Sequence, residues 1–262
     1  MTPIRVYVDA VAFLAPMVDG AEALEAFFEG PPTQGEADWQ AQPQFLSPRA
    51  SKRLSPQTRL ALAIAESLTP ALPEDAAWVF ASSLGEGETL KVILDALRTP
   101  EMMVQPLRFQ NAVHNAASGQ WTVAKSFKAP ATSIAALDHT VGAGLLKAGL
   151  QVALEGRSVG LILYDVPLPD PLDALQHMGL PVGAGLALRP EAGPETCATL
   201  TLSATPAPVS EASSAAARAL IDSGNPIARV LPLLERLLGH GDGPVVLGLH
   251  GDIALNVEVA LP

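Results

Sequence analysis

Residues 115–164 read NAASGQWTVAKSFKAPATSIAALDHTVGAGLLKAGLQVALEGRSVGLILY, and this stretch decides the fold. Its pattern predicts a helix over 115–127, a short apolar strand over 132–136 and a second helix over 141–154. The second helix is apolar almost all round, which is typical of a helix buried on every side. The run 159–164 is a continuous apolar strand, as in a sheet covered on both faces. Strands and helices that alternate in this way predict an α/β layered fold.

The flanking sequence continues the same pattern. Ser55 and Pro56 favour the first turn of a helix, so a helix is predicted from there to about Leu68. No internal repeat and no linker interrupts the alternation, so a single domain over residues 1–262 is expected. The other predicted elements are strands over 4–8, 77–82, 182–188 and 197–203 (the last two expected to be neighbours), helices over 21–28, 88–97 and 210–238 (broken at Gly224-Asn225-Pro226), and a closing hairpin over 245–249 and 253–259.

The composition indicates a soluble globular chain. Of its 262 residues, 48% are apolar, which suits a well-buried core and excludes a disordered chain. The net charge of −11 repels nucleic acid and anionic membranes, so neither is expected as a partner. A single cysteine, Cys197, excludes an internal disulfide, and neither a metal nor a cofactor is expected. Residues 1–8 lack the features of a signal peptide, and no run approaches the ~20 apolar residues of a membrane span, so a cytoplasmic location is expected.

The stretch 115–164 also carries a resemblance to a known family. Residues 115–119 (NAASG) open the first predicted helix, and residues 128–130 (KAP) follow its end. This order and spacing resembles the N-terminal half of β-ketoacyl synthases, which have a thiolase-like fold. In that family a strand follows, and a cysteine then stands at the head of a buried helix. The same spacing here places Asp138 at the position of the cysteine.

The resemblance covers roughly residues 4–165. Residues 182–188 and 247–259 resemble, more loosely, a later strand and the glycine-rich closing hairpin of the family. The resemblance implies an α/β, thiolase-like layered α-β-α fold. The chain would hold mainly the N-terminal half of a β-ketoacyl synthase, with a shortened remainder over 166–262.

Most of the family's site residues are missing. The resemblance implies a cysteine thiolate at a helix N-terminus, where the helix dipole favours the charged form, and two histidines from the C-terminal half. Asp138 is a poor acyl acceptor because a carboxylate is a weak nucleophile, and we interpret it as a helix cap. Cys197 lies in an alternating run and is interpreted as a small core residue. His240 is assigned to a turn and His250 to the wall of a remaining cavity. No catalytic residue is therefore expected.

A chain that keeps the dimer-forming half and loses the chemistry resembles a chain-length factor. Such a subunit heterodimerises with an active β-ketoacyl-[acyl carrier protein] synthase and shapes its acyl tunnel in polyketide, aryl polyene or fatty-acid-like biosynthesis. It would meet acyl carrier protein only indirectly. Two alternatives stay open. One is a stand-alone acyl-binding or scaffold protein, and the other is a decarboxylase or acyltransferase that uses Asp138 and His139.

The partner interface is predicted around residues 131–136. In the family this strand pairs with its counterpart across a two-fold axis. Its side chains here are small and uncharged, which lets two backbones approach to about 4.8 Å. Trp121, on the preceding helix, is predicted as an anchor. The alternative is that these segments are ordinary core. The predicted interface residues are Asn115, Trp121, Ala131, Thr132, Ser133, Ile134, Ala135 and Ala136.

Overall fold

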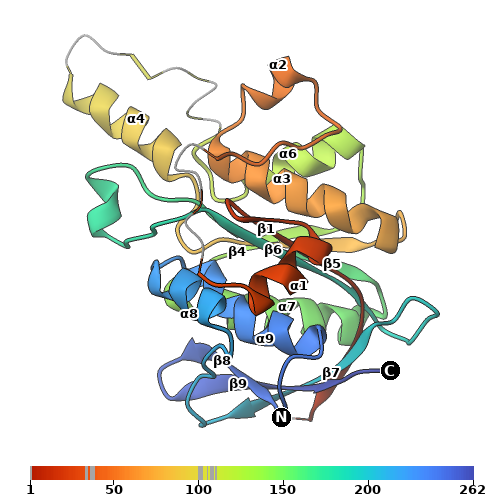
Figure 1. Cartoon of the computed structure of the whole chain (residues 1–262). Coiled ribbons are helices and arrows are strands. Elements are labelled where there is room, and N and C mark those ends of the chain that lie inside the picture. The colour runs from red at the N-terminus through yellow and green to blue at the C-terminus, as the bar shows by residue number, and fades with distance from the viewer. Residues whose placement is uncertain are drawn as a thin grey trace.

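The computed structural model describes residues 2–32, 35, 39–99, 103, 104, 106, 109 and 111–262. Nine strands of these residues form one sheet in the order β4-β3-β5-β6-β1-β7-β9-β8, with β2 paired to β1 (Figure 1). The strands are β1 (Ile4–Ala15), β2 (Val18–Asp19), β3 (Ala77–Ala81), β4 (Ala131–Ile134), β5 (Val159–Asp165), β6 (Val182–Arg189), β7 (Ala198–Thr205), β8 (Val245–His250) and β9 (Ile253–Ala260). The helices are α1 (Ala21–Glu29), α2 (Pro48–Ser51), α3 (Pro56–Leu68), α4 (Gly87–Arg98), α6 (Ala116–Lys125), α7 (Thr140–Glu155), α8 (Ala215–Asp222) and α9 (Leu231–Leu237), with 3-10 turns η2 (Leu137–His139) and η4 (Pro226–Val230).

Helices cover both faces of this sheet (Figure 1). On one face, α3 and α6 pack against β4, β5 and β6 around a core that includes Trp78 and Trp121. On the other face, α7, α8 and α9 enclose a larger apolar core. These are the α-β-α layers of the expected thiolase-like fold. The far end of the sheet, formed by β7, β9 and β8, curls beneath α7 and α9.

The buried helix α7 lies between two parts of the same sheet. A Cβ atom added at Gly142 would lie 2.3 Å from the carbonyl oxygen of Gly248 in β8. A Cβ atom at Gly144, on the opposite side, would lie 3.1 Å from Leu163 in β5. The two glycines therefore let strands approach α7 from both sides. This placement buries much of the helix and accounts for its apolar composition there, but the prediction of burial on every side is wrong for its last turn, where Leu154 is 81% exposed.

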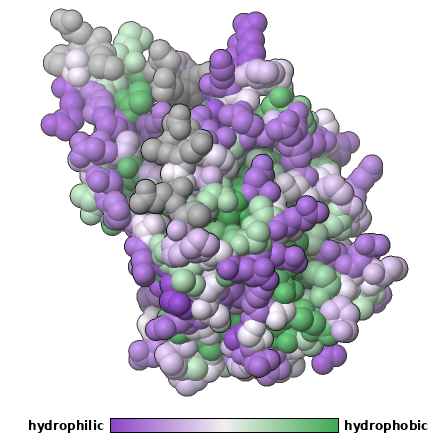
Figure 2. Space-filling view, viewed as in Figure 1, coloured by the Kyte–Doolittle hydropathy of each residue, from purple (hydrophilic) through white to green (hydrophobic). Residues whose placement is uncertain are grey.

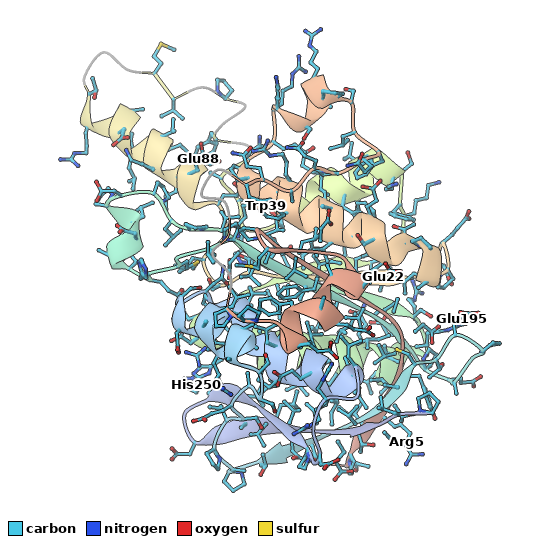
Figure 3. The ribbon with its side chains drawn as sticks, in the orientation of Figure 1. Arg5, Glu22, Trp39, Glu88, Glu195 and His250 are labelled. Atoms are coloured by element: carbon cyan, nitrogen blue, oxygen red, sulfur yellow. The ribbon has the colours of Figure 1, made fainter. Side chains whose placement is uncertain are left out.

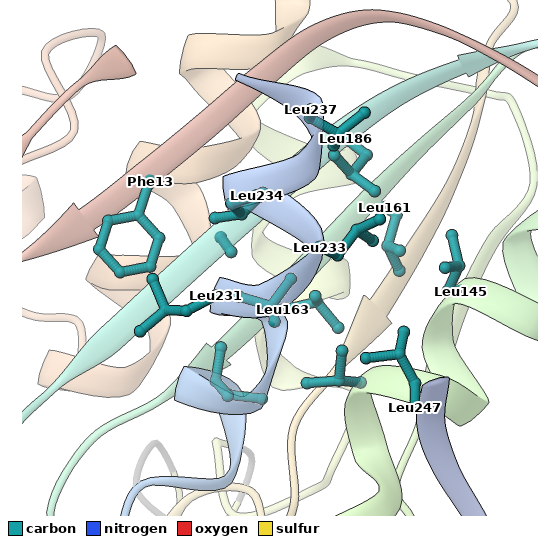
Figure 4. Packing of buried hydrophobic residues seen from close by; sticks show 14 of the residues in the cluster. Phe13, Leu145, Leu161, Leu163, Leu186, Leu231, Leu233, Leu234, Leu237 and Leu247 are labelled. Atoms are coloured by element: carbon teal, nitrogen blue, oxygen red, sulfur yellow. The ribbon is translucent and has the colours of Figure 1, made fainter. Parts of the chain in front are cut away.

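The leucines of α9 fill the space between this helix and the sheet. Figure 4 shows Leu233 of α9 beside Leu161 of β5 and Leu237 of α9 beside Leu186 of β6, all in the same apolar core as Leu145 of α7 and Leu247 of β8. All of these side chains are almost fully buried. Burying one leucine side chain stabilises a fold by about 1.5–3 kcal/mol, so α9 contributes substantially to holding the curled sheet closed.

Several element boundaries agree with the sequence predictions. The Ser55 hydroxyl accepts a hydrogen bond from the Thr58 N–H (3.0 Å), and α3 ends at Leu68 as expected. The closing hairpin is confirmed as β8 and β9. The predicted helical stretch over 210–238 instead starts at α8, where Ser214 caps the first turn. In the described part of the chain, no helix combines the length and apolarity that a membrane crossing needs.

The predicted neighbouring pair, 182–188 and 197–203, is wrong. β1 lies between β6 and β7 and pairs antiparallel with both. The prediction stopped this first strand at residue 8, but it continues to Ala15. The apolar run after Asp9 pairs with β6, while the first half of the strand pairs with β7. A strand of this length can pair with β7 along its first part and with β6 along its second part.

Candidate functional site at the head of α7 and the edge of the sheet

Asp138 lies in the short turn η2, between strand β4 and the head of α7. Leu137 just before it has φ +48°, a left-handed conformation that a branched side chain rarely adopts. The Thr140 hydroxyl stabilises this turn, since it accepts from the Ala136 N–H (3.1 Å) and donates to the Leu137 carbonyl (2.7 Å). The turn therefore presents Asp138 at the surface rather than against the helix.

The interpretation of Asp138 as a helix cap is wrong. No side-chain hydrogen bond caps α7, and the exposed Asp138 carboxylate instead accepts a hydrogen bond from Gln176 Nε2 (2.7 Å). The neighbouring His139 ring packs on β8, where a Cβ atom added at Gly248 would lie 2.8 Å from its Nδ1 atom. The two residues thus contact different elements and do not form an acid–base pair.

A pocket of about 470 Å³ opens beside Asp138 and His139. Its apolar walls come from α7, α8, α9 and β8, and charged residues stand among them. Arg218 is already engaged, because its Nη1 donates to the carbonyls of Ala212 (2.9 Å) and Ser213 (2.6 Å). The pocket lining holds no thiol. It is lined by Asp138, His139, Val141, Gly142, Val209, Ser210, Glu211, Ala212, Arg218, Ile221, Asp222, Arg229, Pro232, Val246, Leu247 and Gly248.

The histidines do not rebuild a catalytic site. His240 lies in the turn between α9 and β8, as expected, with its ring against Phe28 (5.6 Å between ring centroids). His250 ends β8 with an exposed side chain and does not line the pocket, so the expectation that it lines a cavity is wrong (Figure 3). In the described ranges, no group of three or more His, Cys, Asp or Glu residues is arranged to hold a metal ion.

Cys197 lies just before β7, away from this pocket. Its N–H and its thiol both donate to the carbonyl of Val8 (2.8 and 3.2 Å). Burial raises the pKa of the Cys197 thiol, so the thiol is protonated at neutral pH and is a poor nucleophile.

We expect Cys197→Ala to keep the function of the chain intact. Its cost to the free energy of unfolding should be at most about 1–2 kcal/mol, because a half-buried side chain and one weak hydrogen bond are lost. Urea denaturation and partner binding check this. A folded variant that loses its function would contradict the assignment of Cys197 to structure.

Strand β4 forms one edge of the sheet, and β3 is its one neighbour among the strands that the structure describes. The carbonyls of Pro130 and Ile134 accept bonds from β3, from the N–H groups of Trp78 and Ser82. In a parallel pair the alternate residues turn their backbone groups the other way. The N–H and C=O groups of Ser133 therefore point to the open edge, where another strand can pair with them.

Helix α6 borders this edge with a small-residue surface. Asn115, Gly119 and Val123 are exposed at helical spacing, and Val123 is 78% exposed. A Cβ atom added at Gly119 would meet nothing within 4 Å. The Ser118 and Ser133 hydroxyls lie 2.9 Å apart and tie α6 to β4. Helix α6 therefore exposes an uncharged row of residues, Asn115, Gly119 and Val123, and is held to β4 beside the open strand edge.

The assignment of Trp121 as an interface anchor is wrong. Its side chain is fully buried within this chain, and its ring centroid lies 5.1 Å from that of Trp78 and 5.6 Å from that of Phe45. Trp121 therefore anchors α6 on the sheet and cannot reach a partner directly. Leu137, which the prediction passed over, is 56% exposed next to the β4 edge.

A buried polar network, also missed by the sequence reasoning, lies where β3 and β5 end. The Asp165 carboxylate accepts hydrogen bonds from the Ser82 hydroxyl (2.7 Å), the Ser83 N–H (3.0 Å) and Gln57 Nε2 (3.2 Å). Glu86 accepts from hydroxyl groups at the start of α3. Burial raises the pKa of both carboxyl groups, and these hydrogen bonds oppose the rise. The sequence did offer one sign of this network, because Asp165 directly follows the continuous apolar run 159–164.

These features define a class of protein: a thiolase-like layered domain whose buried helix begins beside a pocket without a thiol. The chain belongs to the family of the β-ketoacyl synthase N-terminal domain, whose family model matches residues 29–238. None of the curated protein sequences matches the chain.

Solved structures share the fold of this chain, two of them across nearly its whole length. One is a ketosynthase (ApeO) in complex with its chain length factor (ApeC) from Xenorhabdus doucetiae, with 20% identity, a TM-score of 0.73 and coverage of 97% of this chain and 99% of the other. The ishigamide ketosynthase/chain length factor matches with 15% identity, a TM-score of 0.70 and coverage of 98% and 99%. The type II polyketide synthase complex AntDE:AntF matches with 12% identity, a TM-score of 0.58 and coverage of 72% and 64%. The first two matching chains are therefore close to this one in length.

Proposed function

We propose that this chain is a non-catalytic, chain-length-factor-like subunit that heterodimerises with an active β-ketoacyl-[acyl carrier protein] synthase. Asp138 carries the proposal. At the head of α7, where the family resemblance places the cysteine, the chain has an exposed carboxylate bound to Gln176. A carboxylate is too weak a nucleophile to take an acyl group from a thioester and hold it. The only thiol of the chain, Cys197, lies elsewhere and is protonated.

The partner is proposed from the open edge of the sheet. Strand β4 has outward N–H and C=O groups and is bordered by the small residues of α6. A matching strand of a ketosynthase would extend the sheet across the contact, since backbone hydrogen bonds pair any two strands of suitable spacing. The likeness to chains from ketosynthase and chain length factor complexes supports this partner.

Through this contact the chain would close one side of the partner's acyl tunnel and so limit the length of the product. The pathway is proposed to be polyketide, aryl polyene or fatty-acid-like biosynthesis in the cytoplasm. Acyl carrier protein would be met indirectly, through the ketosynthase. Co-expression with candidate ketosynthases, followed by affinity purification of one subunit, tests the proposal. A stable one-to-one complex is expected with one of them. A chain that purifies without any of the candidates would contradict it.

We expect the isolated chain to show no condensing activity. A thiolactone inhibitor of ketosynthases should label nothing, because Asp138 replaces the thiolate and Cys197 is protonated. Intact-mass spectrometry measures the labelling, and an active ketosynthase serves as the positive control. Stoichiometric labelling at any residue would overturn the non-catalytic assignment.

A stand-alone acyl-binding protein is the second candidate, because the pocket of about 470 Å³ beside Asp138 has largely apolar walls. Native mass spectrometry separates the two functions. The second candidate is favoured if the purified protein carries a bound acyl chain and binds none of the candidate ketosynthases.

A further inference from the structure

One segment of this acidic chain is basic. Residues 39–65 contain Arg49, Lys52, Arg53 and Arg59 and no Asp or Glu, whereas the whole chain has a net charge of −11. The segment forms α2 and most of α3. In Figure 2 the surface is hydrophilic where α2 projects from the molecule.

Arg59 is the unusual member of this segment because it is buried. Its side chain is 8% exposed, and its Nη2 atom donates to Gln40 Oε1 (2.7 Å). Its Nε atom has no hydrogen-bond partner, and no carboxylate of the described residues lies within ion-pair distance of it. Burial lowers the pKa of Arg59, and the nearby Glu88 partly offsets this. A buried guanidinium without a carboxylate costs stability unless an anion compensates it.

Arg59 lines a polar cavity of about 390 Å³ beside the start of α3. Lys52 and Arg53 add two exposed cations to its walls, and Asn111 and Gln120 add amides. Further lining residues are Gln40, Leu54, Ser55, Pro56, Thr58, Glu88 and Thr89. Among the described lining residues, three cations face a single carboxylate, which favours an anion in the cavity.

An apolar slot of about 230 Å³ adjoins this cavity and shares Gln40, Pro56 and Glu88 with it. Its other walls are the side chains of Trp39, Ala41, Leu60, Val166, Pro167, Pro169 and Pro181. Figure 3 shows Trp39 and Glu88 on the same side of the molecule, next to α3 and α4. The cavity and the slot together offer a cationic group and an apolar wall to one ligand.

We propose that this double cavity binds a small amphipathic anion, with its carboxylate or phosphate group on Arg59 and its apolar part in the slot beside Trp39. An anion bound to the Nε–H would give this unpaired donor a partner and would complete the compensation that Glu88 supplies only in part. The site involves neither Asp138 nor the β4 edge. One wall residue, Gln120, lies on α6, which borders the proposed interface, so anion binding is measured on the isolated chain.

Isothermal titration calorimetry of the full chain tests the site with four probes: octanoate, octyl phosphate, octanol and inorganic phosphate. We expect one of the two alkyl anions to bind in a one-to-one ratio, and the stronger of them identifies the head group. Octanol and inorganic phosphate should bind at least about 10-fold more weakly, since each lacks one half of the ligand. Equal binding of octanol and the alkyl anions would overturn the proposal, as would no binding of either anion.

Variants locate the binding. Arg59→Met should weaken the alkyl anion at least about 10-fold, whereas Arg49→Met, which removes the same charge outside the cavity, should change it little. Arg59→Met should not lower the Tm of the unliganded chain, because it removes an uncompensated charge. If that variant does not fold, Arg59→Lys keeps the charge but loses the Nε donor, and it should still bind more weakly.

Glu88→Gln should have the opposite effect and tighten anion binding, because the exposed carboxylate on the cavity wall repels an anion. Binding that is unchanged by both Arg59→Met and Glu88→Gln would place the anion elsewhere and overturn the proposal. The proposal would also be overturned if Lys52 and Arg53 bound only a large acidic protein and the chain had no affinity for either alkyl anion.

Discussion

Ser133→Pro is expected to dissociate the complex with the ketosynthase while leaving the chain folded. The Ser133 N–H points to the open edge of the sheet, so its loss breaks no bond to β3. Edge strands tolerate proline where the N–H faces outward. A strand paired there would lose a backbone hydrogen bond and meet the proline ring. Affinity should fall about 100-fold, measured by analytical ultracentrifugation or calorimetry of the reconstituted pair.

Ser133→Ala is the matched control for this prediction. It removes the hydroxyl contact with Ser118 but keeps the outward N–H, so the complex should persist. Circular dichroism checks that both variants keep their secondary structure. A Ser133→Pro chain that still binds its partner would place the interface elsewhere. An unfolded variant would show that the strand is ordinary core.

Asp165→Ala is expected to lower the free energy of unfolding by about 3–5 kcal/mol, the largest stability effect of any substitution considered. The side chain is 1% exposed and accepts bonds from Gln57, Ser82 and the backbone of Ser83. Its removal leaves these buried donors without partners. Asp165→Asn should cost less, because its oxygen can still accept from Gln57 and Ser82. Urea denaturation compares the two, and equal costs would contradict this account.

The same residue should make stability depend on pH. Burial raises the pKa of Asp165 in the folded chain above its ordinary value in the unfolded chain. The folded state therefore keeps its proton over a pH range in which the unfolded state loses it. The free energy of unfolding should fall as the pH rises from the ordinary carboxyl range through the raised pKa. Asp165→Asn should flatten this slope, leaving the contribution of Glu86, whose pKa is raised by burial as well.

Local chemistry made parts of the fold predictable from the sequence. Ser55 followed by Pro56 marks a helix start with its own hydrogen bond, and the structure has that bond. The apolar composition of α7 indicated burial, and its glycines are approached by strands on two sides of the helix, although its last turn is exposed. The position of Asp138 just before this helix followed from the resemblance to the β-ketoacyl synthase family, whose spacing the chain keeps.

The remaining features depend on tertiary packing, which local patterns do not encode. Trp121 looked like an anchor because tryptophans are common at interfaces, but Trp78 and Phe45 surround it within the chain. Asp138 looked like a cap, but Gln176, remote in sequence, holds its carboxylate. The residues that line the Arg59 cavity come from a loop, from a helix and from positions after 110. A local sequence pattern therefore cannot reveal the cavity.

The central position of β1 has a consequence for synthesis on the ribosome. Ile4 pairs with Leu202, and Leu14 pairs with Gly183, so this strand leaves the ribosome nearly 170 residues or more before the partners on either side of it. Contacts between segments so far apart in the sequence form slowly. An apolar strand that stays unpaired during this time is prone to misassembly. The nascent chain should therefore bind a chaperone through residues 4–15 until β6 and β7 have left the exit tunnel.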